Sequence, residues 1–458
     1  MTDTFRFIDL FAGVGGFHHA LEGLGGECVL AVEWDSACRE VYQAAFPEME
    51  WVPDIREAQP AGGGPALVGD IRTITRNADG TDATPDEIRA RVPAHDVLCA
   101  GFPCQPFSKS GGQLGVRDQT RGTLFFDIME IVRAREPRFV VLENVPNLVG
   151  PRHRQTWRLI IDALREAGYR VSSEPVIVSP HRLPPQHGGS PQVRDRVFIL
   201  AVRDPELAEG EIPPLVARPP FVGWDPAHWS LEHVLRHDGN GGDLRPVELM
   251  WLNAWDAFVK GIPDDALPGF PLWVDAWTEE PVIPPGTPAW KEEFLRKNSR
   301  FYVEHREFLD SWMEEAWDSA GTTVRDFPPS RRKFEWQARS VHRTRKGRTL
   351  WDLLIQLRPS GIRVKAPTYF PALVAITQTS IVGSQRRRLT PREAASLQQL
   401  PWEPFVRAGV DDAAIYKQVG NAVNVGVVRF VTKTLIETYG LHPSEQRDAD
   451  VIQMPLIA

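Results

Sequence analysis

A single cysteine flanked by prolines is the side chain of this sequence best suited to nucleophilic chemistry. Cys104 stands in Pro-Cys-Gln-Pro, directly after an apolar run at residues 96–100 and ahead of a loop rich in glycine and polar residues. A thiolate in such an exposed loop can attack an electron-poor carbon. We expect Cys28, Cys38 and Cys99, which lie in apolar or amphipathic segments, to be small buried side chains. Because no cysteines have the paired spacing of a zinc site, we expect no metal.

A carboxylate and two arginines have the chemistry to bind a planar polar substrate. Glu143 follows Val-Val-Leu at the end of an apolar run, where burial can raise its pKa enough for proton donation near neutral pH. Arg194 and Arg196 stand in Gln-Val-Arg-Asp-Arg before another apolar run, and guanidinium groups bind planar polar groups through paired hydrogen bonds. The alternative is that Glu143 is a solvated strand-end residue and that both arginines pair with surface acids.

Three glycines after the first apolar run predict a nucleotide-cofactor turn. Gly13, Gly15 and Gly16 lie in FAGVGG, and Glu33 follows Gly13 by twenty residues at the end of the next apolar run. Glycines let a ligand approach the backbone, and an acid at the second strand tip can hold a ribose diol. His18 occupies the position where a dinucleotide fingerprint needs its third glycine, so a pyrophosphate cradle is not expected. An ordinary tight turn between strand and helix is the alternative.

Alternating strands and helices must position these residues. Apolar strand-like runs alternate with amphipathic helix-like stretches through the first 204 residues. We predict strands at 5–11, 27–34, 96–100, 138–143, 170–178 and 196–202, and helices over 35–46 and 155–167, with a capping box at 84–87. Such alternation predicts a doubly wound α/β sheet, in which ligands bind beyond the carboxyl ends of the strands. Cys104 directly follows one of these strands and is therefore aimed at the expected cofactor crevice.

The sequence pattern changes after residue 204, which indicates a second, smaller domain. Eleven of the 15 tryptophans lie within residues 224–351, and one long helix is predicted over 290–317. Regular structure returns with a capping box at Thr390-Pro391-Arg392-Glu393 and a final helix over 422–439. We divide the chain into a catalytic cofactor-binding domain (1–204), a second domain (205–385), a helical motif of that domain (386–414) and a C-terminal helix that returns to the catalytic domain (415–458).

Charge is unevenly distributed along the chain. The net charge is −8, and residues 264–318 alone hold 13 acids and 5 bases. Residues 331–348 hold 8 bases and 1 acid, so this basic block predicts a phosphate-binding surface or, equally, a solvated loop. No apolar stretch is long enough to span a membrane and the start lacks a signal-peptide pattern, so we expect a cytoplasmic location and no membrane partner.

Nine motifs occur in an order that resembles the cytosine carbon-5 DNA methyltransferase family. They are FAGVGG, Glu33-Trp34, Gly69-Asp70-Ile71, GFPCQPFS, RGTLFFDI, Glu143-Asn144-Val145, QVRDR, RRLTPREAASLQQLP and QVGNAV. The resemblance covers residues 5–204 and 361–437, and segment 205–360 falls where that family places its variable target-recognition domain. It implies a Rossmann-like fold that binds S-adenosylmethionine. Two departures, Gln-Gln-Leu-Pro and Ala422 where many members have serine, leave the catalytic roles unchanged.

The resemblance implies a cofactor role for each matching residue. S-adenosylmethionine would lie in a pocket formed by Phe11, Gly13, Gly15, Gly16, Glu33, Trp34, Asp70, Ile71, Pro103, Leu124, Asn421 and Ala422. In this pocket Glu33 would hold the ribose, Trp34 would lie beside the adenine and Asp70 would bind the adenine amino group.

The resemblance also implies four catalytic residues. Cys104 would add to carbon 6 of cytosine, because carbon 5 becomes nucleophilic only after that addition. Glu143 in its protonated form would neutralise charge on ring nitrogen 3. Arg194 would hold the carbonyl oxygen of the base, and Arg196 would support the reaction centre. The target cytosine must leave the base stack to reach these groups.

The implied function is DNA (cytosine-5) methylation at a specific double-stranded sequence. We expect the enzyme to act in restriction-modification or phage defence, alongside a cognate restriction endonuclease or defence proteins, and to be monomeric on DNA. The first alternative is a tRNA cytosine-5 methyltransferase, against which the large segment 205–360 argues because duplex readout needs a dedicated surface. The missing third glycine disfavours a nicotinamide oxidoreductase. A catalytically silent DNA-binding relative would more often have lost Cys104, Glu143 or the arginines.

Overall fold

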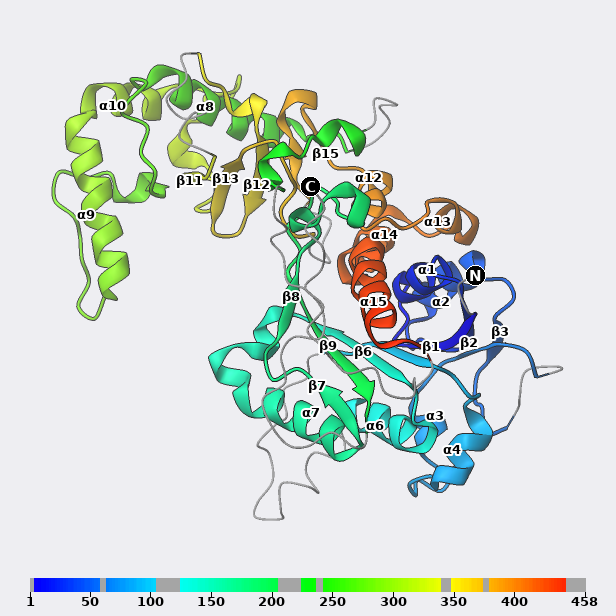
Figure 1. Cartoon of the computed structure of the whole chain (residues 1–458). Helices are drawn as coiled ribbons and strands as arrows, with labels where there is room; N and C mark the ends of the chain where they lie inside the picture. Colours follow the sequence, from blue (N-terminus) through cyan, green and yellow to red (C-terminus); the bar gives the residue numbers. More distant parts are fainter. Residues whose placement is uncertain are drawn as a thin grey trace. The chain divides into compact units, whose positions relative to one another are not determined.

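The chain folds into two compact units, shown in the computed structural model of Figure 1. The structure describes residues 4–57, 63–103, 124–204, 224–235, 242–338, 347–373 and 379–441. Unit 1 comprises Met1–Ser190, Arg194–Asp225 and Leu397–Ala458, and unit 2 comprises Pro191–Val193 and Pro226–Ser396. Among the helices of the described ranges, none combines the length and the apolar character that crossing a membrane requires.

Unit 1 is built on a sheet that has nine strands within the described residues. These are β1 (Phe5–Leu10), β2 (Gly26–Val32), β3 (Glu50–Val52), β4 (Ala66–Val68), β5 (Val97–Gly101), β6 (Phe139–Asn144), β7 (Tyr169–Val171), β8 (Val176–Val178) and β9 (Arg196–Arg203). The order is β3-β4-β2-β1-β5-β6-β9-β7, and β8 also pairs with β9. The strands from β3 to β6 in this order are parallel, whereas β9 runs antiparallel to β6, β7 and β8.

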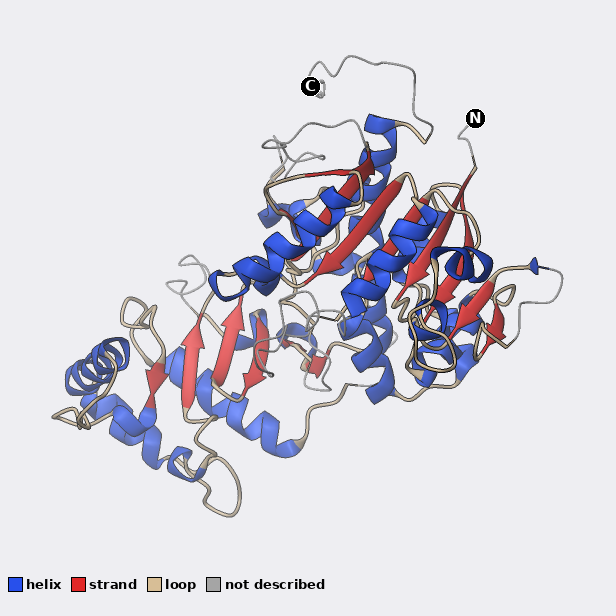
Figure 2. Ribbon diagram, turned by 90° about the horizontal axis from the view of Figure 1, so that it is seen from below, coloured by secondary structure: helices blue, strands red, loops and turns tan. Residues whose placement is uncertain are grey.

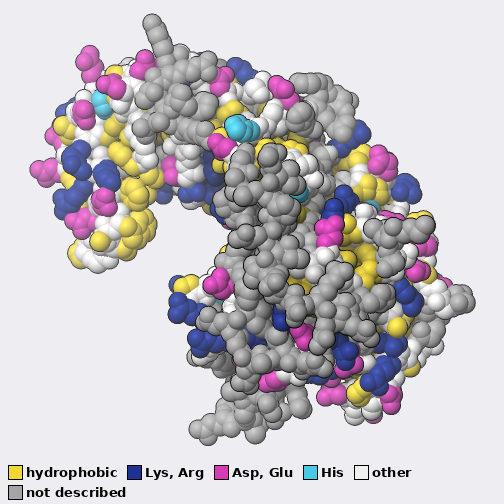
Figure 3. Space-filling view, in the orientation of Figure 1, with side chains coloured by type: hydrophobic (Ala, Val, Ile, Leu, Met, Phe, Trp, Pro, Cys, Tyr) yellow, Lys and Arg dark blue, Asp and Glu magenta, His cyan; other side chains and the backbone are white. Residues whose placement is uncertain are grey.

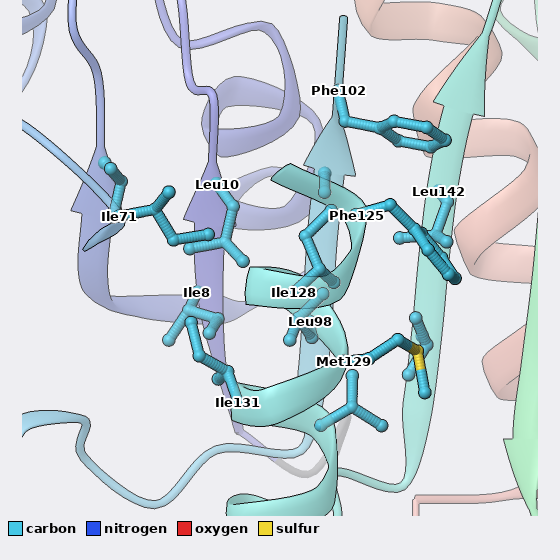
Figure 4. Packing of buried hydrophobic residues seen from close by; sticks show 14 of the residues in the cluster. Ile8, Leu10, Ile71, Leu98, Phe102, Phe125, Ile128, Met129, Ile131 and Leu142 are labelled. Carbon is cyan, nitrogen blue, oxygen red and sulfur yellow. The ribbon is translucent and has the colours of Figure 1, made fainter. Parts of the chain in front are cut away.

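Helices cover both faces of this sheet (Figure 2). They are α1 (Gly16–Glu22), α2 (Ser36–Ala45), α3 (Arg72–Thr75), α4 (Pro85–Arg91), α6 (Leu124–Arg135), α7 (Arg154–Glu166), α13 (Glu403–Ala408), α14 (Asp412–Asn421) and α15 (Val425–Tyr439). On one face, α6 packs Phe125, Ile128 and Met129 into one apolar cluster with Ile8 of β1 and Leu142 of β6 (Figure 4). On the other, α1 lies against α15. The predicted doubly wound α/β fold is confirmed.

The order of the strands creates a switch point between β1 and β5. From β1 the chain proceeds outward to β2 on one side, whereas β5 leads to β6 on the other side. Ligands of open α/β sheets bind at such a reversal, beyond the carboxyl ends of the two strands. FAGVGG follows β1 and Gly-Phe-Pro-Cys spans the end of β5, so both motifs leave the sheet at this point.

Two local features differ from the sequence-based expectation. The strand predicted over 170–178 is divided into β7 and β8, because Ser172 closes a turn in which its Oγ donates to the carbonyl oxygen of Glu174. Residues 397–414 are expected in the second domain from the sequence, but the chain re-enters unit 1 at Leu397. In unit 1, α13 packs against α2.

Unit 2 combines a small mixed sheet with three longer helices. Its strands are β10 (Leu272–Trp273), β11 (Lys333–Trp336), β12 (Leu354–Arg358), β13 (Gly361–Lys365), β14 (Ile381–Val382) and β15 (Arg387–Arg388), and its longer helices are α8 (Pro246–Gly261), α9 (Ala289–Glu304) and α10 (Arg306–Glu314). Trp255 of α8 is fully buried and stacks on Phe334 of β11, with ring centroids 4.8 Å apart. Much of the tryptophan content of this segment therefore forms a core.

The long helix predicted over 290–317 is interrupted at His305. Its backbone leaves the helical conformation there, so α9 and α10 are separate helices. The break lets Phe301 from α9 and Trp312 from α10 contact the same ring, that of Trp277. Acidic and basic side chains are interspersed over α9 and α10 (Figure 3). Several of the acids form ion pairs with arginine or lysine along these helices.

The described arginines of the basic block serve the packing of unit 2. Arg331 is buried, stacks over Trp251 at 5.2 Å and donates to the carbonyl oxygen of Arg358. Arg348 is buried too and donates to the carbonyl oxygen of Ile262. The prediction that the block as a whole binds phosphates is therefore wrong for these two residues, since their guanidinium groups are engaged inside the unit. Its members at 339–346 lie outside the described residues.

Candidate active site

The glycine turn after β1 has the left-handed backbone that its sequence demands. Gly13 and Gly15 have φ angles of 58° and 84°, and Phe11 also has a positive φ of 60°. A Cβ on Gly15 would lie 2.5 Å from the Phe46 ring, so this glycine is required for packing. A Cβ on Gly13 would meet nothing within 4 Å, which leaves open space above the turn. His18 fills the position of the missing third glycine and stacks on Phe46.

Glu33 is bound directly to the glycine turn. Its Oε2 accepts a hydrogen bond from the backbone N–H of Gly13 at 2.7 Å, and its Oε1 accepts one from Asp35 at the same distance. Burial raises the pKa of Glu33, and these two hydrogen bonds oppose that rise. Each carboxylate oxygen retains acceptor capacity for a further donor.

The neighbouring segments present an aromatic ring and a second carboxylate. Trp34 is 70% exposed, which is unusual for so large an apolar side chain. Asp70 follows β4, is partly exposed, and accepts from the backbone N–H of Arg72 at 3.0 Å. Ile71 is buried in the apolar cluster beneath it. An exposed ring beside two carboxylates can bind a nucleoside by stacking and by accepting from its hydroxyl and amino groups.

The loop that carries the predicted nucleophile begins at the carboxyl end of β5. Cys104 itself lies outside the described residues, which end at the exposed Pro103 and resume at the half-buried Leu124. The Phe102 carbonyl oxygen accepts a hydrogen bond from Asn144 Nδ2 at 2.9 Å. This bond fixes the peptide that precedes Pro103, two residues before Cys104.

The buried Glu143, near the end of β6, forms an ion pair with the half-buried Arg196 at the start of β9. Arg196 Nε lies 2.8 Å from Glu143 Oε1. Burial raises the pKa of Glu143, and the nearby charges of Arg196 and Arg194 oppose the rise. The sheet register explains the contact, because Glu143 pairs with Phe198 and Val197 with Asn144, next to Arg196. This arrangement can present a proton from the Glu143 carboxyl group and the N–H groups of the Arg196 guanidinium to the same polar edge of a substrate.

Arg194 contacts backbone carbonyl groups, whereas Arg196 contacts a carboxylate. It is buried, and its Nη2 donates to the carbonyl oxygens of Gly420 at 3.0 Å and Ala422 at 2.5 Å. Burial lowers the pKa of Arg194 to about 9. Its contacts hold the QVGNAV segment against β9, where Asn421 is exposed. Arg194 therefore positions part of the predicted cofactor pocket.

The close approach of three glycine-containing segments brings these groups together. A Cβ on Gly16 would lie 2.6 Å from Val423 Cγ2, so only glycine allows the QVGNAV segment to reach the turn. A Cβ on Gly101 would lie 3.6 Å from Glu143 Oε2 and 3.9 Å from Val423 Cγ1. Val423 therefore lies beside both the glycine turn and the end of β5, and Glu143 lies beside the end of β5.

Two polar residues of this region were not singled out from the sequence. Asn144 was only part of a motif, and its bond to Phe102 depends on the neighbouring strand. Asp9 lies in the middle of β1 and is fully buried, and a backbone hydrogen bond from His18 only partly offsets the effect of this burial. Burial raises its pKa well above the ordinary value. An acid inside the apolar run Phe-Ile-Asp-Leu was a signal for this residue.

A family model of C-5 cytosine-specific DNA methylases matches residues 5–221 and 284–437. The chain belongs to this family. The match extends over more of the middle segment than the motifs alone indicated. The predicted DNA (cytosine-5) methyltransferase is thereby confirmed over the tRNA enzyme that was its first alternative.

Individual relatives of this DNA methylase are similar over different lengths. The Type II methyltransferase M.AluI of Cellulosimicrobium cellulans is 40% identical over 94% of this chain and 91% of that protein. The Type II methyltransferase M.HpaII of Haemophilus parainfluenzae is 39% identical over 44% of this chain and 46% of that protein. A solved structure, a DNMT2 mutant of Spodoptera frugiperda, has a TM-score of 0.48 and 19% identity, covering 94% of this chain and 99% of that one.

Proposed function

We propose that this DNA methylase transfers a methyl group from S-adenosylmethionine to carbon 5 of a cytosine flipped out of a specific duplex sequence. We further propose that it does so as the modification enzyme of a restriction-modification system. The observation that best supports this reaction is the ion pair between the buried Glu143 and the half-buried Arg196, near the switch point of the sheet. The names of the Type II relatives support the biological setting.

The residues around the glycine turn fit the proposed cofactor. Gly13 leaves open space above the turn, Glu33 retains acceptors for a ribose diol, and the exposed ring of Trp34 offers a stacking face for adenine. Asp70 can accept from the adenine amino group. When bound, S-adenosylmethionine supplies an electrophilic methyl group. Pro103, Leu124, Asn421 and Ala422 remain proposed members of the same pocket.

The proposed chemistry assigns one task to each catalytic side chain. The Cys104 thiolate adds to carbon 6 of the base, and Glu143 donates its proton to ring nitrogen 3 as charge arrives there. Carbon 5 then accepts the methyl group. A solvent water molecule takes the proton from carbon 5, and the electron pair of that C–H bond forms the C5=C6 double bond and expels the Cys104 thiolate from carbon 6. The aromatic ring is restored, and the proton on nitrogen 3 returns to Glu143.

The geometry favours Arg196 over Arg194 as the arginine that holds the carbonyl oxygen of the base. Arg196 lies next to the carboxylate that engages the same base edge. Arg194 is committed to the carbonyl oxygens of Gly420 and Ala422, which supports a positioning role. We therefore propose Arg196 for the carbonyl oxygen of the base, in place of Arg194, which the resemblance implies.

A covalent trap tests the proposed function. A duplex with 5-fluorocytosine at the target should form a stable adduct, because fluorine cannot leave carbon 5 as a proton does. The adduct should require S-adenosylmethionine and should be absent in Cys104→Ser, while this variant still binds the cofactor. Mass spectrometry of the adducted peptide locates the attachment. An adduct at another residue, or turnover by Cys104→Ser, would remove Cys104 from the mechanism.

A further inference from the structure

Arg39, which belongs to none of the nine motifs, fixes the backbone that carries two residues of the proposed cofactor pocket. It lies in α2, and its Nη1 donates to the carbonyl oxygens of Glu33 at 3.1 Å and Trp34 at 2.5 Å. These carbonyls lie just beyond β2, where the chain leaves the sheet. One donor that binds two successive carbonyls limits the rotation of the peptides between them. Arg39 thereby limits the directions in which both side chains can project.

The same guanidinium connects this strand tip to the next part of the pocket. Its central carbon lies 4.3 Å from the centroid of the Trp51 ring, which belongs to β3. The ring in turn lies beside Gly69, because a Cβ there would be 3.0 Å from Trp51 Cη2. Gly69 directly precedes Asp70, so the stack of Arg39 on Trp51 spans from Trp34 to Asp70.

The N-terminus of α2 is also held from the other side. Asp35 caps the helix through the backbone N–H of Ala37 at 3.0 Å, and Lys417 of α14 pairs with Asp35 at 3.1 Å. Gln418 donates to the carbonyl oxygen of Ala37 at 2.9 Å. Because α2 is anchored to α14, the backbone from which the Arg39 side chain extends is held in place.

We propose that the Arg39–Trp51 stack is a positioning device for the adenosine half of S-adenosylmethionine. It sets the spacing between the ribose-holding carboxylate of Glu33, the exposed ring of Trp34 and the carboxylate of Asp70. Neither Arg39 nor Trp51 is required to touch the cofactor. The inference rests on the proposed function, because it concerns the site proposed there for the cofactor.

Binding of S-adenosylhomocysteine, measured by isothermal titration calorimetry, tests the device without any methyl transfer. Arg39→Gln should raise the dissociation constant about tenfold, because it removes both the hydrogen bonds to the carbonyl groups and the stack. Arg39→Lys should also weaken binding, since an ammonium keeps the charge near Glu33 but has no plane to lie on Trp51. Trp51→Leu should weaken binding to a similar extent, and Trp51→Phe should weaken it less. The double variant Arg39→Gln/Trp51→Leu should bind no more weakly than the weaker-binding single variant.

Arg133→Gln is the matched control, because Arg133 pairs with Glu130 on the exposed side of α6. It should bind S-adenosylhomocysteine like the wild type. Thermal unfolding of every variant separates a lost fold from a displaced pocket, and Arg39→Lys and Trp51→Phe remain informative if the larger changes unfold the protein. Wild-type affinity in both Arg39 variants and in Trp51→Leu overturns the inference. Wild-type affinity in Arg39→Lys alone shows that charge, and not the stack, is responsible, and overturns it too.

Steady-state kinetics give an independent readout. Because the stack does not touch the reacting atoms, Arg39→Lys should raise KM for S-adenosylmethionine several-fold and leave kcat at saturating cofactor nearly unchanged. A fall in kcat with an unchanged KM contradicts the inference. If the wild type itself fails to bind S-adenosylhomocysteine, the proposed function fails and the inference fails with it. If the wild type binds S-adenosylhomocysteine and the variants bind it equally well, only the inference is overturned.

Discussion

Glu143 is held between two opposing influences, and its ionisation should control the rate of methyl transfer. Burial raises its pKa and favours the proton that the reaction needs, whereas Arg196 and Arg194 favour the carboxylate. Because the neutral carboxyl is the donor, single-turnover rates should fall as pH rises through its pKa. Glu143→Gln should slow transfer by on the order of 10² and should remove that falling limb. A variant within a few-fold of the wild type would make Glu143 structural.

Asp9 should make stability depend on pH. Burial raises its folded pKa against the opposing effect of a backbone hydrogen bond from His18, and Glu33 adds to the rise, so the folded protein keeps a proton that the unfolded chain releases. Stability is therefore full below the ordinary aspartate pKa and is lost as pH rises towards the folded value, by about 1.4 kcal/mol per pH unit. Urea unfolding at pH 5 and pH 7 should show the wild type losing stability relative to Asp9→Asn. Equal pH dependence in the two proteins would contradict this.

The sequence identified the residues whose side-chain type indicates a chemical role. It did not identify the residues that act by holding neighbouring groups in position. Cys104 and Glu143 stood out because a thiol between prolines and a carboxylate after Val-Val-Leu are rare settings. Asn144 and Arg39 did not, because each donates to carbonyl oxygens, a partner that every residue carries. Arg194 and Arg196 were indistinguishable in their motif, and only the direction of each side chain in the fold separates their roles.

At the level of elements, the start of α15 depends on two glycines that touch. A Cβ on Gly426 would overlap the carbonyl oxygen of Gly188 and the side-chain amide of Gln399. Gly426→Ala should therefore lower the free energy of unfolding by about 3 kcal/mol in urea titrations, because backbone must move. Gly409→Ala, at a positive φ with no atom within 4 Å of the added carbon, should cost only about 1 kcal/mol. Equal costs would show that the approach is not tight.

Helices and strands with several apolar residues were predictable from the sequence. Those whose bounds depend on contacts with other elements were not. β1, β5, β6 and β9 appear within one or two residues of their expected bounds, as does α2 with Asp35 as its cap. β3 and β4 have three residues each, which is too short for a period to be visible. The break between α9 and α10 coincides with the contacts of Phe301 and Trp312 with Trp277, which no local pattern contains.

At the scale of the whole molecule, the basic block at residues 331–348 contains arginines with two different expected roles. One role is the stability of unit 2, and the other is DNA binding. Arg331→Gln should lower the thermal midpoint, because it removes the stack on Trp251 and the hydrogen bond to the Arg358 carbonyl oxygen. Neutralising Arg339, Arg343 and Arg345 together should instead flatten the salt dependence of DNA binding, by roughly 0.9 log unit for each phosphate that is no longer neutralised. Binding constants measured over a series of salt concentrations distinguish the two. An unchanged slope in the triple variant would place the phosphate-binding groups elsewhere.

Unit 2 should carry the choice of target sequence, because every proposed catalytic and cofactor residue belongs to unit 1. Replacing residues 226–396 by the segment that lies between the corresponding motifs of a relative with a different target should transfer methylation to the sequence that this relative modifies. Bisulfite sequencing of plasmid DNA from cells that express the hybrid measures the result. An active hybrid that keeps the original target would assign recognition to unit 1.

Pro191–Val193 belongs to unit 2 although its flanking residues belong to unit 1, so any exchange of unit 2 must preserve its pairing. The segment is bound to Phe370 through main-chain groups, with Phe370 N donating to Pro191 at 2.7 Å and Val193 N donating to Phe370 at 2.8 Å. Main-chain groups carry no side-chain identity. A replacement segment must therefore present an extended residue at the position of Phe370, so that its main-chain N–H and carbonyl groups can pair with Pro191 and Val193.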